Sequence, residues 1–388
     1  MKGSVQLLVC LLTGSLFQVA VAEEPALRQA MIKGLLVVEL GDGSHAGTAS
    51  QMNGTVVKGS GTGFEVSFNQ EVGEMMESAT SEVAKFMSVR HGDDLPEGVK
   101  VELAFADKYS PKDGPSAAVV SALLCESIIS GDVIDSGFAA TGDMTATGEV
   151  RSIGGLTGKI SGAIKKGCEL LAAPEANKSS FQDLLLIDGI KPLYEIQLFT
   201  ISDFEQARAI AMEERDEDMQ TAIDEFELVQ GALKKDEAFL KNQKVREKLR
   251  NIVQLAPNHV SARLLYLESV GKAPSQLSLP GSLTKIEQAA GSLSAMLQDG
   301  SFLESKGNDN VLFRLANDIA NMRPMLDPRT LDYSDSYSDV ANYVKQLRGR
   351  SQISRGQVEK FNQMVETVVA ERENLLNDQE IREELMLE

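Results

Sequence analysis

One serine in this sequence, Ser116, is placed where it could act as a nucleophile. It lies in PKDGPSAAVV, residues 111–120, where a turn containing proline and glycine leads into an apolar helical run. Serine is also a common helix N-cap, because its hydroxyl satisfies a backbone N–H that the first turn leaves free. Nucleophilic chemistry requires in addition a base that takes the serine proton. The stretch alone fits a cap, whereas a partner base would make Ser116 a nucleophile.

Histidine is the most familiar base for a serine nucleophile, but the histidines of this chain are poorly placed for that role. His45 is expected in a glycine-rich loop, His91 at the end of a helix and His259 in a helical region. No sequence feature directs any of them toward Ser116. The sequence therefore argues against a Ser-His-Asp triad.

Lysine is the alternative base, provided that burial lowers its pKa enough for a neutral amine to exist. Lys159 follows a glycine-rich turn and is expected in the first turn of an amphipathic helix. Gly162 and Ala163 lie three and four residues further on, so the lysine is on a small-residue face that another element can approach closely. Lys165 and Lys166, near the end of this helix, complement its dipole and need no other role. Lys159 is thus the candidate base.

The glycines around Lys159 also resemble a phosphate-binding loop, but the pattern fails. A Walker A motif needs GxxxxGK followed by Ser or Thr. Counting back from Gly158-Lys159, the first glycine position is Ile153, and the residue after the lysine is Ile160. The sequence contains no other match to the motif, so no ATPase module is predicted.

The elements that would position these residues change character near residue 200. Up to that point strand-like and helix-like runs alternate, which describes an α/β or α+β domain. Beyond Ser202 the chain is almost continuously helical, with charged, amphipathic, leucine-spaced runs. The expected strands are 31–40, 54–58, 63–69, 99–106, 137–141 and the run ELLAAP, and the expected helices are 71–90, 116–130 and 157–167.

Four ordered blocks of the sequence resemble the proteolytic domain of Lon proteases. They are EVGEMMESA (71–79), PKDGPSA (111–117), TGD…GEV..IGGL..K (141–159) and AAPEANKSSF (172–181). The resemblance implies a Lon-type α+β fold, in which Ser116 is the nucleophile and Lys159 its general base. It also implies that Thr141 helps to position the lysine and that Asp113 is the motif aspartate near the serine.

The resemblance is incomplete at several positions. Ala118 stands where the family usually has glycine, Asp143 stands where it usually has glutamate, and AFADKYS (104–110) replaces an approach that carries a histidine in many relatives. No AAA+ unfolding module is expected before the domain. We therefore expect an ATP-independent serine endopeptidase that cleaves unfolded or flexible polypeptides through an acyl-enzyme. Because Lon domains commonly close into rings, the resemblance also implies a homo-oligomer.

An apolar stretch at the N-terminus predicts export. Residues 5–21 are mostly apolar and short for a membrane span, and an acidic segment follows Ala22, as expected of a signal peptide over residues 1–22. The mature protein is then expected in a periplasmic or extracellular compartment, free of the membrane. Such a compartment permits a disulfide between Cys125 and Cys168, but two buried free thiols are favoured.

The remaining sequence is expected to form two units. Residues 23–212 are the Lon-like proteolytic domain, and residues 213–388 are an all-α C-terminal region. Within that region LAPNHVSARLLYLES is typical of one tetratricopeptide-like helical hairpin, and a plain helical bundle fits at least as well. Loops are expected over 273–281 and 327–339.

The amino-acid composition of the chain limits the kinds of partner that it is expected to bind. The 388 residues include 57 acidic and 38 basic ones, a formal net charge of −19. Nucleic acid and anionic membrane both require a basic footprint, so neither is an expected partner. Cysteine and histidine are too sparse for a structural metal site, and no cofactor is expected. The expected partners are a polypeptide substrate, further copies of the chain, and a protein bound by the helical region.

Two hypotheses follow from these observations. The first is a Ser-Lys endopeptidase whose helical C-terminal region recruits substrate or partners. The second is a non-catalytic scaffold or binding protein that keeps the Lon fold. The presence of both Ser116 and Lys159 favours the first hypothesis.

Overall fold

A mixed β-sheet is the framework of the first half of the protein. The computed structural model describes residues 25–39, 45–61, 63–106, 113–299, 309–348 and 352–385, and the predicted signal peptide lies outside these ranges. Among the described residues, seven strands pair in the order β3-β4-β2-β1-β5-β8-β9, and β6 and β7 form a separate pair. The strands are β1 Gln29–Glu39, β2 His45–Lys58, β3 Glu65–Phe68, β4 Val99–Phe105, β5 Phe138–Ala140, β6 Asp143–Met144, β7 Val150–Arg151, β8 Leu170–Pro174 and β9 Gln197–Ile201.

The two halves of the sheet differ in strand direction. β1, β2 and β4 are antiparallel, with β1 and β2 paired from Gln29↔Thr55 to Glu39↔His45. β1, β5, β8 and β9 run parallel. Every residue of β5 and β8 is buried, as expected for parallel strands that are covered on both faces. The apolar runs in these two strands therefore mark the centre of the domain.

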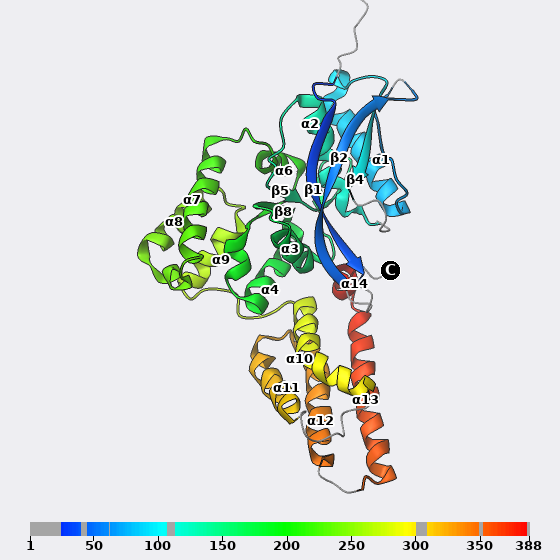
Figure 1. Ribbon diagram of the computed structural model, residues 1–388, viewed down its shortest axis with the longest axis vertical. Coiled ribbons are helices and arrows are strands. Elements are labelled where there is room, and N and C mark those ends of the chain that lie inside the picture. Colours follow the sequence, from blue (N-terminus) through cyan, green and yellow to red (C-terminus); the bar gives the residue numbers. More distant parts are fainter. Residues whose placement is uncertain are drawn as a thin grey trace, which may run out of the picture.

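Helices cover both faces of the sheet and make up the rest of the described chain (Figure 1). They are α1 Glu74–His91, α2 Ala118–Ser130, α3 Leu156–Lys165, α4 Lys178–Asp188, α5 Lys191–Glu195, α6 Phe204–Ala211, α7 Glu217–Leu233, α8 Gln243–Leu255, α9 Val260–Ser269, α10 Leu279–Asp299, α11 Asp309–Met322, α12 Leu331–Leu347, α13 Arg355–Leu376 and α14 Gln379–Leu385. The expected α+β class, with a helical region after the sheet, is confirmed.

Helices α2 and α3 lie on opposite faces of β1. A Cβ added to Gly34 would contact Val120 of α2, and a Cβ added to Gly155, just before α3, would contact Val37. Because side chains alternate along a strand, positions 34 and 37 point to opposite faces. Side chains from the two helices can therefore meet only beyond the end of a strand.

Buried apolar side chains of the described residues form two clusters. The first runs from Ala30 to Leu265, and the second from Leu277 to Ile381. Helices α7 to α9 belong to the first cluster, where the His259 ring lies 4.4 Å from that of Phe199 on β9. Helices α10 to α14 build the second cluster, which Figure 1 shows as a bundle below the sheet. The change of hydrophobic core thus falls after α9.

Most expected elements are present, but two loop predictions are wrong. His45 is the first residue of β2 and not part of a loop. The predicted loop over 327–339 is largely helical, because α12 begins at Leu331. Tyr333 and Tyr337 are one helical turn apart and buried, with ring centroids 5.2 Å apart. Burial of these two tyrosines on one face stabilises the helix. The serines and aspartates of YSDSYS made the segment resemble a polar loop in the sequence.

Candidate active site

Ser116 stands at the entry to α2. Gly114 has a φ of 102°, in the left-handed region that favours glycine, and Pro115 opens a short 3-10 helix that leads into α2. The N-cap residue of α2 is Ala117, and no side chain caps this helix. The capping role considered for Ser116 is therefore wrong, and its hydroxyl is free for another partner.

The segment that leaves β5 fixes the backbone of this turn. The Ser116 carbonyl accepts hydrogen bonds from Gly142 N at 2.9 Å and from Thr141 Oγ1 at 3.4 Å. Val119 N donates to the Gly142 carbonyl at 3.1 Å. Ser116 is thus held at the carboxyl end of a parallel strand, where ligands of open α/β sheets commonly bind.

Lys159 of α3 reaches the same point from the other face of the sheet. Its Nζ donates to Ser116 Oγ at 3.2 Å and lies 3.5 Å from Thr141 Oγ1. The lysine is only 1% exposed. The structure therefore brings together Ser116, Lys159 and Thr141, three of the residues that the sequence predicts for the site.

Close approach of β2 explains how a lysine is buried here. A Cβ on Gly162 would lie 2.4 Å from the Gly47 carbonyl carbon, and a Cβ on Gly47 would lie 1.9 Å from the Gly158 carbonyl oxygen. Glycine at these positions lets the β2 backbone lie directly against α3. The small-residue face predicted around Lys159 is confirmed.

Burial changes the protonation of Lys159. Removing the amine from water disfavours its charged form and lowers the pKa of Lys159 to about 8, while the charge of Glu384 acts in the opposite direction. A lysine of ordinary pKa would hold almost no neutral amine at pH 7, whereas about a tenth of this one is neutral. The site therefore has an amine that can accept a proton near neutral pH.

Asp113 contacts α1. One of its carboxylate oxygens accepts from Gly114 N at 2.7 Å and from Met76 N at 3.2 Å. The N-cap of α1 is Gly73, which has no side chain of its own, and a Cβ there would lie 2.0 Å from the Asp113 carboxyl carbon. Asp113 therefore caps α1 from a distance and ties that helix to the turn that presents the serine.

The chain matches a known family over the segment that builds this site. The family described as the Lon protease (S16) C-terminal proteolytic domain matches residues 16–210, half of the chain. The chain belongs to this family. Its Lon proteolytic domain therefore contains the sheet, both helices that meet at the site, and Ser116 with Lys159.

Individual Lon proteases are similar over shorter segments. The Lon protease of Leptospira interrogans is 30% identical over 141 residues, which cover 36% of this chain and 16% of that protein. The Lon protease of Desulforamulus reducens is 33% identical over 106 residues, or 27% of this chain and 13% of that protein. The chain thus spans less than a fifth of the length of these relatives.

Two histidines of the protein have partners away from the candidate site. His91 Nε2 lies 2.9 Å from a Glu126 carboxylate oxygen, and His259 Nε2 lies 3.1 Å from Gln197 Oε1. Burial lowers the pKa of His259 to about 3, so its ring is neutral. These partners agree with the prediction that neither histidine serves Ser116.

Glu384, on α14, is a residue near the candidate site that the sequence did not indicate. Its carbonyl accepts a hydrogen bond from Gly155 N at 2.8 Å, at the start of the helix that carries Lys159. Burial, and then the charge of Asp183, raise the pKa of Glu384 to about 7. No motif or spacing near residue 384 marks it, because its approach depends on the folding of the whole C-terminal region.

Cys125 and Cys168 are free and buried, as the sequence favoured, and Cys168 lies between α3 and β8. Within the described ranges no group of three or more His, Cys, Asp or Glu residues is arranged to hold a metal ion. No helix in this part of the chain is long and apolar enough to cross a membrane.

Proposed function

We propose that this protein is a serine endopeptidase that uses Ser116 and Lys159 as a catalytic pair. Its substrates are unfolded or flexible polypeptide segments. The observation that carries the proposal is the 3.2 Å contact between Lys159 Nζ and Ser116 Oγ, made by a lysine that is almost fully buried. Membership of a family of proteolytic domains supports the same reaction class.

The reaction proceeds in two stages. Neutral Lys159 takes the proton of Ser116, and the serine oxygen attacks the peptide carbonyl to give a tetrahedral intermediate. Collapse of the intermediate breaks the C–N bond; the lysine ammonium protonates the leaving amine, and an acyl-serine remains. Water, deprotonated by the same lysine, then hydrolyses the ester and releases the carboxylate product.

The roles of the remaining site residues follow from their contacts. Thr141 Oγ1, 3.5 Å from Lys159 Nζ, positions the amine beside the serine. Ser116 also lies at the start of α2, where free N–H groups and the positive end of the helix dipole favour a developing oxyanion. Each well-placed oxyanion donor contributes about 3 kcal/mol to the stability of the transition state.

Cleavage is proposed to be independent of ATP. The printed sequence contains no GxxxxGK[ST] motif, so this chain brings no recognisable phosphate loop of its own. We also propose that the protein acts after export, as a homo-oligomer, with its helical C-terminal region free to bind a protein partner. Substrates that are already unfolded need no ATP-driven unfolding before they reach Ser116.

The direct test compares Ser116→Ala and Lys159→Ala with wild type on fluorescently labelled casein, with and without ATP. Both variants are expected to lose at least about a thousandfold in rate, because each removes one member of the pair. Ser179→Ala and Lys165→Ala, both exposed on the surface, are the matched controls and should cleave like wild type. A serine-directed acylating probe should label wild type at Ser116.

Two results would overturn the proposal. Retained cleavage by a correctly folded Ser116→Ala variant would place the nucleophile elsewhere. Absence of both cleavage and labelling in wild type, across a library of unfolded polypeptides, would favour the scaffold hypothesis.

A further inference from the structure

The last helix of the chain contacts the start of the helix that carries Lys159. Gly155, with φ of 67°, is the N-cap of α3, and its N–H donates to the carbonyl of Glu384 on α14 at 2.8 Å. Lys159 follows one turn later, and its own N–H donates to the Gly155 carbonyl at 3.0 Å. The C-terminal region therefore docks directly on the backbone that positions the proposed base.

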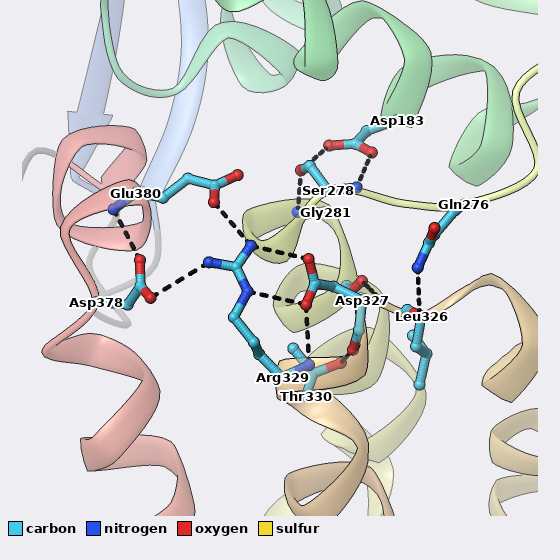
Figure 2. Close-up of polar contacts among 11 residues, drawn as sticks. Asp183, Gln276, Ser278, Gly281, Leu326, Asp327, Arg329, Thr330, Asp378 and Glu380 are labelled. Carbon is cyan, nitrogen blue, oxygen red and sulfur yellow. Dashed lines mark hydrogen bonds and ion pairs between the residues drawn. The ribbon is translucent and has the colours of Figure 1, made fainter.

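An arginine holds α14 in this place. Arg329, in the short 3-10 helix Pro328–Thr330 before α12, pairs with Asp378 at 3.4 Å and with Glu380 at 2.9 Å. Asp378 immediately precedes α14, and Glu380 lies in its first turn. The other partner of Arg329 is Asp327, at 2.9 Å. Figure 2 shows the guanidinium between these carboxylates. Ile381, fully buried in the second hydrophobic core, adds an apolar anchor.

A second set of contacts fixes the C-terminal bundle to the proteolytic domain. Asp183 of α4 accepts from Ser278 N at 2.9 Å and from Ser278 Oγ at 2.5 Å, at the entry to α10 (Figure 2). Gly281 gives the carboxylate room, since a Cβ there would lie 2.4 Å from the Asp183 carboxyl carbon. Lys285 Nζ also donates to the Ile187 carbonyl at 3.4 Å. The contacts of Arg329 with α14 and of Asp183 with the start of α10 thus fix the position of Glu384.

The charges that face Glu384 come from two neighbouring helices. Asp183 on α4 repels its carboxylate, and Lys159 on α3 attracts it. Glu380, on the same helix, acts on Asp183. Glu384 is partly buried, so its interaction with the lysine is screened less than that of a surface pair. Attraction between Glu384 and Lys159 favours the protonated amine, which is the form that cannot act as a base.

We propose that Glu384, whose carbonyl accepts from Gly155 N at the start of the helix that carries Lys159, is a positioning residue for the Ser116–Lys159 pair, and that the C-terminal helix restrains the protease through this contact. This inference rests on the proposed function of that pair. Movement of α14 away from Gly155 removes the restraint and leaves more neutral amine beside the serine. The helical region thereby becomes a regulator of the same site.

The test measures kcat/KM from pH 6 to pH 10 for full-length wild type and Glu384→Gln on a fluorogenic unfolded polypeptide. Loss of the carboxylate charge should move the acid limb of the profile down by about half a pH unit, which corresponds to about twofold higher activity at pH 7.5. Glu384→Asp keeps the charge and should restore most of the wild-type profile. Glu373→Gln, an equal charge change at an exposed position of α13, should leave it unchanged.

A readout that does not need turnover separates this inference from the proposed function. In the Ser116→Ala background, the 13Cε signal of Lys159 should titrate at lower pH when Glu384 is replaced by Gln. If the wild type is active and neither its profile nor this titration moves with Glu384→Gln, the inference is wrong and the proposed function stands. If cleavage does not depend on Ser116 or Lys159, the proposed function fails regardless of the titration.

Discussion

At the scale of single residues, Lys159 combines a functional requirement with an energetic penalty. A base must be neutral to accept a proton, and burial supplies neutral amine by disfavouring the charged form. The same burial destabilises the folded protein wherever the lysine is still protonated. A pKa of about 8, lowered from 10.5, means that this penalty applies in full below about pH 8. Activity and stability therefore make opposite demands on this side chain.

We predict that Lys159→Met, which keeps an unbranched side chain and removes the charge, stabilises the fold at pH 7. The gain should be up to about 3 kcal/mol, the free energy that corresponds to the pKa shift. Between about pH 8 and 10.5 the unfolded state binds more protons than the folded one, so wild type gains stability and the difference shrinks. Urea unfolding at pH 7, 9 and 10.5 measures the difference in the free energy of unfolding between the variant and wild type.

Lys165→Met, at an exposed position of the same helix, is the control and should show no such pH-dependent gain. A Lys159→Met variant that is less stable than wild type at pH 7 would show that the hydrogen bonds to Ser116 and Thr141 outweigh the penalty of burial.

At the scale of elements, the site depends on a contact between a strand and a helix without intervening side chains. Gly47 of β2 lies against Gly158 and Gly162 of α3, so the two backbones set the position of Lys159. On the other side, the turn before α2 is fixed to the segment that leaves β5. The serine and the lysine thus come from opposite faces of the sheet and meet where β5 ends.

We predict that Gly162→Ala both destabilises the protein and slows cleavage. The new Cβ would lie 2.4 Å from backbone atoms of Gly47, so β2 and α3 must separate, at a cost of about 1–3 kcal/mol. Gly231→Ala is the matched control, since that glycine lies in α7 with open space around it and should gain about 0.5–1 kcal/mol. Denaturation midpoints and cleavage rates check both; equal behaviour of the two variants would contradict the proposed contact.

At the scale of the whole molecule, the C-terminal bundle has its own hydrophobic core and touches the proteolytic domain through polar contacts and through Leu186 and Ile187 of α4, which pack against that core. Surface ion pairs contribute little to global stability, typically less than about 1 kcal/mol each. The Arg329 pairs are of this kind, since the arginine side chain is 49% exposed. Loss of these pairs should therefore loosen α14 at a small cost in global stability.

We predict that Arg329→Ala changes global stability by less than about 1 kcal/mol and loosens α14. Hydrogen exchange should accelerate in α14, and the acid limb of the activity profile should move in the same direction as for Glu384→Gln. Arg355→Ala, which removes a pair with Glu359 within α13, is the control. Unchanged exchange in α14 would show that apolar contacts such as Ile381 hold the helix without the arginine.

The sequence by itself determined the local elements and the chemistry expected of the site. Strand and helix periodicities identified the sheet and its main helices, because these patterns reflect contacts within a few residues. The residue types around Ser116 and Lys159 indicated a Ser-Lys pair, and the glycines indicated a close approach to the lysine. The local pattern was misleading at YSDSYS, where the polar residues predicted a loop although the two tyrosines lie on the buried face of a helix.

Only the tertiary structure decided which distant surfaces meet. It gave Asp113 the role of capping α1, placed α7 to α9 on the core of the sheet, and brought Glu384 to the start of α3. Such contacts join residues that are far apart in the chain, so no spacing in the sequence encodes them. They follow from the simultaneous packing of two hydrophobic cores and the polar groups between them.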